Sequence, residues 1–202
     1  MNKKYQKYLM VFEQDEKWGF YINNLGRASV DKNIEYPSKG HPGSHMFTWE
    51  KGRTLDEFHF VLITEGEGEF ESKETGKKKI LPGDGFLLFP GMWHRYRPNK
   101  KTGWSERWVG FSGPIAKQFL SNGFFKSQSP VISKCNRSTV LGYFDTLFQL
   151  FEDEPFGYQR LASGICMQLM AELYNIQQNS NSEDYLNQMV SQTKHLMYNK
   201  IN

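Results

Sequence analysis

Residues 1 to about 112 alternate short apolar or aromatic runs with glycine, proline, asparagine and aspartate. Runs at this regular spacing, separated by turn residues, are typical of antiparallel strands that build a sandwich or a barrel. The stretch WGFYINNLGR (18–27) predicts an additional strand near the N-terminus, whereas KETGKKK (73–79) is interpreted as a turn. The clearest strand candidates are FHFVLIT (58–64), GFLLF (85–89) and WSERWVGFS (104–112).

Beyond residue 112 the apolar positions take the spacing of helices. The Ser-Gly-Pro stretch at 112–114 has the residue types of a helix start. Within 138–152 apolar residues recur every three or four positions, and the Pro-Phe-Gly stretch at 155–157 ends this helix. The segment 158–179 predicts a second helix, whose apolar stripe is wide enough to cover a sheet and also to face a second copy of the chain. This stripe consists of Leu161, Ile165, Cys166, Leu169, Met170, Leu173 and Ile176.

The polar run QQNSNSED (177–184) has the composition of a linker, and the weakly amphipathic segment 185–200 predicts one more helix. We therefore expect a mainly β fold with added α-helices, in which a jelly-roll-like antiparallel barrel is followed by a C-terminal helical hairpin. The expected divisions are 1–112 for a ligand-binding barrel with an N-terminal extension, 113–179 for a helical region, and 180–202 for a linker and the start of a further domain.

The chain has 202 residues, 38% of them hydrophobic, and a formal net charge of +3, which suits one sizeable domain with a hydrophobic core. Basic residues cluster at 77–79 and 95–101 without a basic helix, so solvated loops are favoured over a nucleic-acid surface. Cys135 and Cys166 lie in no metal-ligand spacing and are typical of a reducing compartment. Since no signal-like or membrane-length apolar run occurs, we expect a soluble, cytoplasmic protein without membrane contact.

The segment GDGFLLFPGMWH (83–94) combines a Gly-Asp turn, a Pro-Gly turn and His94. It loosely resembles the second conserved motif of the cupin fold, with one residue slipped. In metal-binding cupins a first motif, H-x-H-x-x-x-E before a glycine turn, supplies the other ligands. Counting back from the TEGEG turn places His59 near the motif's glutamate, and Arg53 and Leu55 near its two histidines. Arginine offers no lone pair and leucine no ligand atom, so we predict neither a metal ion nor another cofactor.

Signals for catalysis are missing from the sequence. It contains no G-x-S-x-G elbow, no phosphate-binding loop and no dinucleotide-binding glycine pattern. His41 and His45 are four residues apart, but the Gly/Pro-rich stretch GHPGSH that holds them does not have a helical pattern. We predict no catalytic residue and expect that the protein is not an enzyme.

Strand alternation indicates a pocket for a small molecule instead. It places His94 and Tyr96 on one face of their strand, and Trp104, Glu106 and Trp108 on one face of the last strand. If both faces point inward, the barrel holds aromatic plates together with one carboxylate and one imidazole. Such a pocket suits a ligand with polar and apolar parts, for example a sugar. The alternative for His94 is a core histidine that is hydrogen-bonded to the backbone.

Three segments together resemble the effector-binding N-terminal domain of AraC-type transcriptional regulators: EFHFVLITEGEGEFES (57–72), GDGFLLFPGMWHRYRP (83–98) and WSERWVGFSGP (104–114). The most specific part is the pattern W-x-x-x-W-x-x-F-x-G, formed by Trp104, Trp108, Phe111 and Gly113. The resemblance covers about residues 30 to 180.

The resemblance implies a cupin-like barrel that binds a small effector, often a sugar, without metal. It also implies a homodimer formed through the helices 138–152 and 158–179. DNA would be read by a C-terminal helix-turn-helix domain that is absent from this chain, of which 185–200 resembles the first helix. In some members an N-terminal arm closes over the ligand; if residues 1–48 do so, Trp49 lies near the pocket mouth. The ligand-binding candidates are then His94, Tyr96, Trp108, Glu106, His59, Arg53 and Trp49.

Two other interpretations stay open. A metal-dependent cupin enzyme, such as an isomerase or dioxygenase, would need ligands beyond His59 and His94, for example Glu106 or a histidine from 41–45. A stand-alone sugar-binding module would have no regulatory partner. The sequence favours a sugar as effector because aromatic faces stack on pyranose rings, but an aromatic acid or a cyclic lipid-like molecule also fits an aromatic pocket.

Overall fold

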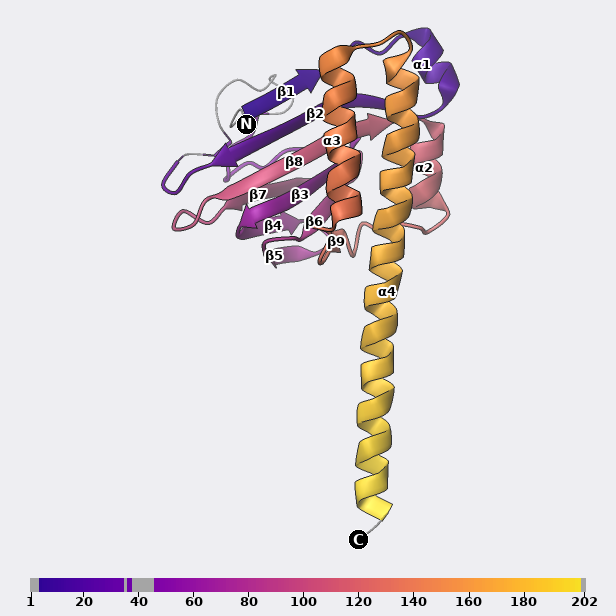
Figure 1. The fold of residues 1–202 in the computed structure, drawn as a ribbon. Helices are drawn as coiled ribbons and strands as arrows, with labels where there is room; N and C mark the ends of the chain where they lie inside the picture. Colours follow the sequence, from indigo (N-terminus) through magenta and orange to yellow (C-terminus); the bar gives the residue numbers. More distant parts are fainter. Residues whose placement is uncertain (1–3, 35, 38–45, 201–202) are drawn as a thin grey trace.

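Two antiparallel sheets form the body of the molecule, and the helices α3 and α4 cover the outer side of the larger sheet (Figure 1). The computed structural model describes residues 4–34, 36–37 and 46–200, with side chains up to Asn179. The strands are β1 (Lys4–Tyr8), β2 (Tyr21–Val30), β3 (Phe58–Gly66), β4 (Gly68–Ser72), β5 (Gly76–Ile80), β6 (Gly85–Leu88), β7 (His94–Pro98), β8 (Trp104–Ser112) and β9 (Val131–Ile132). The helices are α1 (Glu13–Trp18), α2 (Pro114–Ser121), α3 (Ser138–Asp153) and α4 (Tyr158–Lys200).

The larger sheet has the strand order β1-β2-β8-β3-β6-β9, and the smaller one has the order β5-β4-β7. The N-terminal residues add strands to the larger sheet, because β1 pairs with β2 and β2 pairs with β8. The strand predicted at 18–27 is confirmed as β2. It begins only at Tyr21, because α1 continues to Trp18 and Gly19 then takes the left-handed conformation at φ 86°.

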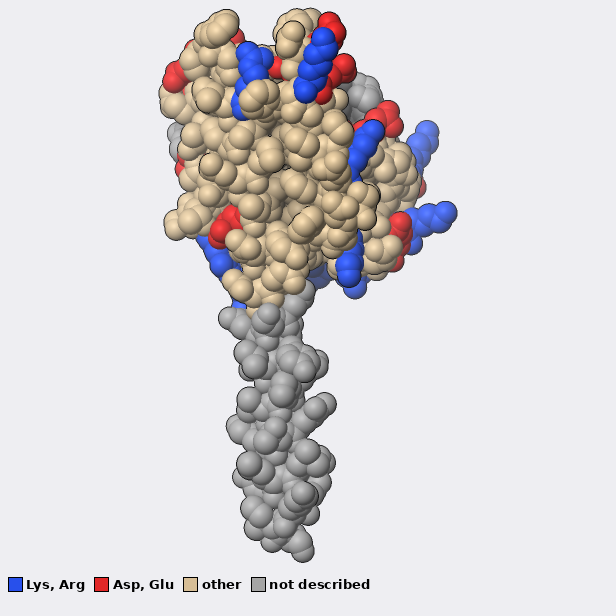
Figure 2. Space-filling view, turned by 90° about the vertical axis from the view of Figure 1, so that its right-hand side faces the viewer, with Lys and Arg blue, Asp and Glu red and all other residues tan. Residues whose placement is uncertain are grey.

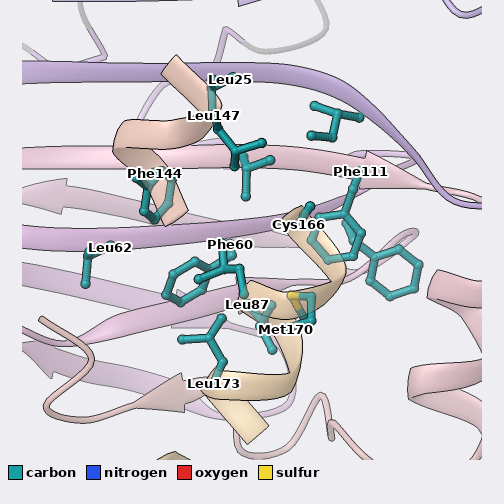
Figure 3. Packing of buried hydrophobic residues seen from close by; sticks show 14 of the residues in the cluster. Leu25, Phe60, Leu62, Leu87, Phe111, Phe144, Leu147, Cys166, Met170 and Leu173 are labelled. Atoms are coloured by element: carbon teal, nitrogen blue, oxygen red, sulfur yellow. The ribbon is translucent and has the colours of Figure 1, made fainter. Parts of the chain in front are cut away.

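The segment predicted as a strand at 58–64 lies in β3, and alternate residues of β3 point to opposite sides of the sheet. Phe60 and Leu62 lie in the hydrophobic cluster on the helix side, whereas Val61 and Ile63 lie in the cluster between the sheets. Figure 3 shows the helix side, where Phe144 and Leu147 from α3 and several residues from α4 pack onto the strands. The residues of α4 that take part are Cys166, Met170 and Leu173.

The cluster between the sheets is rich in aromatic rings. Phe70 and Phe86 lie 5.0 Å apart, and Phe86 and Tyr96 lie 5.1 Å apart, measured between ring centroids. Trp104 and Trp108 from β8 belong to the same cluster, so the faces of β7 and β8 that alternation grouped together do both point inward. This arrangement leaves the polar side chains of these faces inside the fold.

Two predictions about secondary structure are wrong. Residues 77–79 are not a turn but lie in β5, where Lys77 pairs outward with Glu69 of β4, and Lys79 with Glu67 directly before β4. Pairing with β4 therefore overrides the low strand propensity of a lysine run.

The polar run 177–184 does not interrupt the helical region either, because α4 continues through it to Lys200. The run contains neither proline nor glycine, so nothing in it breaks the helical hydrogen bonds. Helix α2 begins at Pro114, as predicted, with Gly113 as its N-cap. Throughout the described part of the chain, no helix combines the length and the apolar character that crossing a bilayer requires.

Candidate ligand-binding pocket

A narrow cavity lies between the two sheets, at the end where the connection between β2 and β3 meets β7 and β8. Its free volume, measured at the centres of a water-sized sphere, is about 20 Å³, which is enough for about one water molecule. The residues around it are Tyr8, Tyr36, Pro37, Phe47, Arg53, His59, Val61, Tyr96, Glu106 and Trp108. The cavity thus combines aromatic rings with a guanidinium, an imidazole and a carboxyl group.

Arg53 is fixed beside the cavity by both its backbone and its side chain. Its backbone N–H and C=O each hydrogen-bond to the backbone of His94 at 2.9 Å, which ties the β2–β3 connection to β7. Its Nε donates to Nε2 of His94 at 3.2 Å, and one terminal nitrogen donates to the hydroxyl of Tyr96 at 2.6 Å. The guanidinium also lies 4.9 Å from the ring centre of Phe47. These contacts hold a cation at a defined place in the wall.

His94 is fully buried and lies behind Arg53. Its Nδ1 is 3.0 Å from the carbonyl oxygen of Met92, so this nitrogen carries the proton and Nε2 accepts from Arg53. Burial, together with the nearby charge of Arg53, lowers the pKa of His94 to about 3. His94 is therefore neutral at physiological pH, and its role in the wall is to position Arg53.

Glu106 is buried, lines the cavity and accepts hydrogen bonds from the hydroxyl of Tyr36, at 3.1 and 3.3 Å to its two oxygens. Burial raises the pKa of Glu106 to about 7, although Tyr36, Arg53 and Trp104 favour the ionised form. The indole N–H of Trp104 is buried without a hydrogen bond of good geometry. Glu106 can thus act as an acceptor or, when protonated, as a donor.

A second polar group lies where β2 and β3 meet the cavity. Nε2 of His59 is 2.7 Å from Oε1 of Glu57, and the amide nitrogen of Asn24 donates to the same oxygen at 2.8 Å. Asn24 lies next to a bulge in β2 and pairs with Gly110 of β8. A Cβ atom at Gly110 would lie 2.4 Å from the side-chain amide nitrogen of Asn24. Gly110 therefore leaves the space that this polar group needs.

Trp108 forms an aromatic wall of the cavity, and a glycine makes room for it. Gly26 of β2 is its partner across the sheet, and a Cβ atom at Gly26 would lie 2.1 Å from the Trp108 ring. The indole can lie flat over the strand only because this side chain is absent.

Of the predicted site residues, five line the cavity: Tyr96, Trp108, Glu106, His59 and Arg53. His94 does not line it and lies behind Arg53. Trp49 does not line it either, because it lies on the outer side of β7, where the guanidinium of Arg97 is 3.7 Å from its ring centre. His41 and His45 lie outside the described residues.

The sequence prediction missed five lining residues: Tyr8, Tyr36, Pro37, Phe47 and Val61. Alternation from His59 along β3 places Val61 on the same face and was a usable signal. Tyr36, Pro37 and Phe47 lie in the irregular connection between β2 and β3, where no periodicity indicates which way a side chain points.

A larger, open depression of about 510 Å³ lies on the surface next to the cavity. Trp49, Met46 and Arg97 are among the residues that line it. Tyr36, Pro37 and Phe47 line both the depression and the inner cavity, so these three residues separate the two spaces.

The residues of the cavity do not fit a metal ion. The one nitrogen of His94 that a metal would need already accepts a hydrogen bond from Arg53, whose positive charge would repel a cation at this position. Among the described residues, no group of three His, Cys, Asp or Glu side chains is arranged to hold a metal.

Comparison with known proteins gives one family match. Residues 34–170 match a family model described as the AraC-like ligand binding domain. This range includes β3 to β8, the helices α2 and α3, and the first part of α4. The search of curated proteins found no match to this chain.

Solved structures similar to this chain include two that are described as cupins. The protein YhaK from Escherichia coli is 13% identical over 55% of this chain and 44% of its own, with a TM-score of 0.39. This chain therefore spans less than half the length of YhaK. A Cupin 2 conserved barrel domain protein from Salinispora arenicola is 18% identical over 60% and 87%, with a TM-score of 0.34. A putative mannose-6-phosphate isomerase from Ralstonia eutropha is 14% identical over 55% and 85%, with a TM-score of 0.34.

Proposed function

Because this chain belongs to the family of AraC-like ligand-binding domains, we propose that it is the effector-sensing and dimerisation domain of a DNA-binding transcriptional regulator. The effector is a small polar molecule, with a sugar as the favoured class. The protein acts by binding and not by catalysis, and it works in the cytoplasm. A separate helix-turn-helix domain makes the DNA contact in this proposal.

The observation that carries the proposal is the composition of the cavity between the sheets. Glu106 and Arg53 offer a carboxyl group and a guanidinium that can exchange hydrogen bonds with ligand hydroxyls. Trp108 and Tyr96 offer aromatic faces on which a sugar ring can stack. A guanidinium in the place of a metal ligand supports binding over metal-dependent chemistry.

The outward face of α4 supports dimerisation with a second copy of the chain. Leu161 is 56% exposed, and the other outward positions over the next three turns carry no charge. These positions are Gly164, Gln168, Ala171 and Asn175. In the view of Figure 2, charged side chains lie mostly toward the margins of the body, and other residues cover its centre. A helix face of this composition suits burial against its own copy.

In this proposal the effector acts by shifting a population. A ligand that binds one arrangement of the dimer better than another biases the whole regulator toward it, by no more than its difference in affinity. The helix α4 would transmit the change, since it starts beside the barrel and leaves it toward the C-terminus (Figure 1).

A thermal-shift screen tests the proposal. Wild-type chain is screened against monosaccharides, oligosaccharides and aromatic acids, with divalent metals and a chelator in parallel arms. A ligand at a hundred times its dissociation constant stabilises the folded state by about 2.7 kcal/mol. We expect a rise in melting temperature with one class of small molecule and no change with metal or chelator. A fall with chelator would contradict the proposal and support a metal enzyme.

A further inference from the structure

Tyr36 differs from the other polar residues of the cavity in how it is held. Glu106, Tyr96 and His59 are side chains of the strands β8, β7 and β3, whose ladders fix them. Tyr36 belongs to no strand or helix. Its phenol nevertheless reaches into the body and hydrogen-bonds to both oxygens of Glu106.

The free volume shows that something must move when a ligand enters. A cavity of about 20 Å³ holds about one water molecule and no organic ring. Most of the wall is built from strand residues, whose displacement would break the sheets. Four lining residues lie outside the strands. Arg53 is tied to the backbone of His94, and the other three, Tyr36, Pro37 and Phe47, also line the open depression of about 510 Å³ outside. These three residues are therefore the part of the wall that can be displaced without breaking a sheet. A ligand would enter the cavity from the depression.

The environment of Tyr36 is that of a bound aromatic ligand. Its ring meets Trp104 edge-on, with centroids 5.6 Å apart at 85°, and it lies 5.8 Å from the ring of Tyr96. Its hydroxyl takes the acceptor that a ligand hydroxyl would use. A ring between aromatic walls, with one hydroxyl on a buried carboxylate, is the pattern that the proposed effector needs.

We propose that Tyr36 occupies part of the effector subsite, so that the effector binds by displacing this side chain, and that the effector is a ring with adjacent hydroxyl groups. This inference rests on the proposed function. It adds the chemical class of the ligand and identifies Tyr36 as the side chain that competes with the ligand for the cavity.

The requirement for adjacent hydroxyls follows from Trp104. The phenol of Tyr36 satisfies Glu106 with its single oxygen, but the buried indole N–H of Trp104, which faces Glu106, has no hydrogen bond of good geometry. The same N–H favours the ionised form of Glu106, so the indole N–H and the carboxyl group lie close enough for one ligand to contact both. A ring with two neighbouring hydroxyls can donate to Glu106 with one and accept from Trp104 with the other, which gives the indole N–H a well-aligned acceptor.

The test measures the affinity of two probes for Tyr36 variants. The probes are cyclohexane-1,2-diol and cyclohexanol, titrated calorimetrically into wild type, Tyr36→Phe and Tyr36→Ala. Tyr36→Phe keeps the ring but loses the bond to Glu106, and we expect it to bind the diol about tenfold more tightly than wild type does. Tyr36→Ala should bind it more tightly still, and cyclohexanol should bind all three proteins more weakly than the diol.

Tyr174→Ala is the matched control. This tyrosine of α4 packs edge-on against Phe124 at 5.3 Å and lines neither the cavity nor the depression. Its loss should leave the affinity for the diol unchanged.

If Tyr36→Ala does not fold, Tyr36→Phe carries the test alone, because removing one hydroxyl preserves the packing. Unchanged or weaker diol binding by Tyr36→Phe would overturn the inference, as would cyclohexanol binding as tightly as the diol.

This experiment can fail independently of the proposed function. If a panel molecule stabilises wild type but the Tyr36 variants show no gain for the diol, the sensor stands and the displacement of Tyr36 is wrong. If the variants gain affinity for the diol while chelator destabilises wild type, Tyr36 occupies a subsite and the regulator proposal is wrong.

Discussion

Nε of Arg53 donates a hydrogen bond to Nε2 of His94 at 3.2 Å, so a buried imidazole serves as acceptor for a guanidinium. The resemblance of the GDGFLLFPGMWH segment to a cupin motif raised the question whether His94 binds a metal. In the structure His94 accepts this hydrogen bond through Nε2 and donates to the carbonyl oxygen of Met92 through Nδ1, so both ring nitrogens have partners. It holds the cation of Arg53 at the cavity wall.

Replacing His94 by leucine should destabilise the fold by about 2 kcal/mol or more, because Nε of Arg53 and the carbonyl of Met92 both lose their partner in a buried place. His94→Gln keeps an acceptor and should cost less. Urea denaturation of both variants measures the difference. Equal stability of His94→Leu and wild type would show that the hydrogen bond to Arg53 contributes nothing.

Glu106→Gln should change how stability depends on pH. The pKa of Glu106 is raised to about 7 in the folded protein, above its value in the unfolded chain, so ionising it opposes folding. The cost is small near pH 5 and grows as pH rises through 7. Relative to wild type, the variant should gain about 2 kcal/mol between pH 5 and pH 8. Denaturation at both pH values checks this.

His94 also makes stability depend on pH, but its pKa is shifted in the opposite direction to that of Glu106. Its pKa is lowered to about 3, so its contribution to stability is complete above pH 6.5 and is lost as pH falls toward 3. Wild type and Glu106→Gln share this effect, which cancels when the two are compared. A parallel pH dependence of the two proteins would contradict the raised pKa of Glu106.

Gly26→Ala should remove Trp108 from its place in the wall. The new methyl group would lie 2.1 Å from the indole, so the ring must move, at a cost of about 2 kcal/mol and with loss of ligand affinity. Gly142→Ala is the matched control, since nothing lies within 4 Å of a Cβ atom at this exposed position of α3. It should stabilise the helix by about 0.5–1 kcal/mol. A Gly26→Ala variant as stable as wild type would mean that Trp108 is not confined by β2.

Leu161→Glu should separate the proposed dimer, because it places a charge on the uncharged outward face of α4. Light scattering after size exclusion should give twice the chain mass of 23.6 kDa for wild type and the single mass for the variant. The melting temperature of the barrel should change little, since Leu161 is 56% exposed. A dimer that persists in the variant would move the interface to another surface.

The sequence predicted those features that follow from strict alternation. His59 on β3, and Glu106 and Trp108 on β8, face the cavity because neighbouring residues of these strands must pack against the helices. Tyr36 follows from no such rule. It lies in an irregular connection, and its direction depends on contacts with residues far away in the sequence, such as Glu106.

Long-range pairing explains the other misses too. The lysines of β5 form a strand only because Glu69 of β4, and Glu67 directly before β4, offer partners on the neighbouring chain segment. Trp49 is likewise placed by long-range contacts, because Arg95 and Arg97 stack on its ring on the outer side of β7. Neither contact can be inferred from the local pattern of apolar residues.

The most direct test of the account observes the indole N–H signals of the five tryptophans by NMR. Each signal is assigned with a Trp→Phe variant, and wild type is titrated with the panel molecule that raises its melting temperature most. Binding in the cavity between the sheets predicts that the signals of Trp108 and Trp104 shift in a saturable way. Saturable shifts confined to Trp18, Trp49 and Trp93, with Trp104 and Trp108 unmoved, would contradict it.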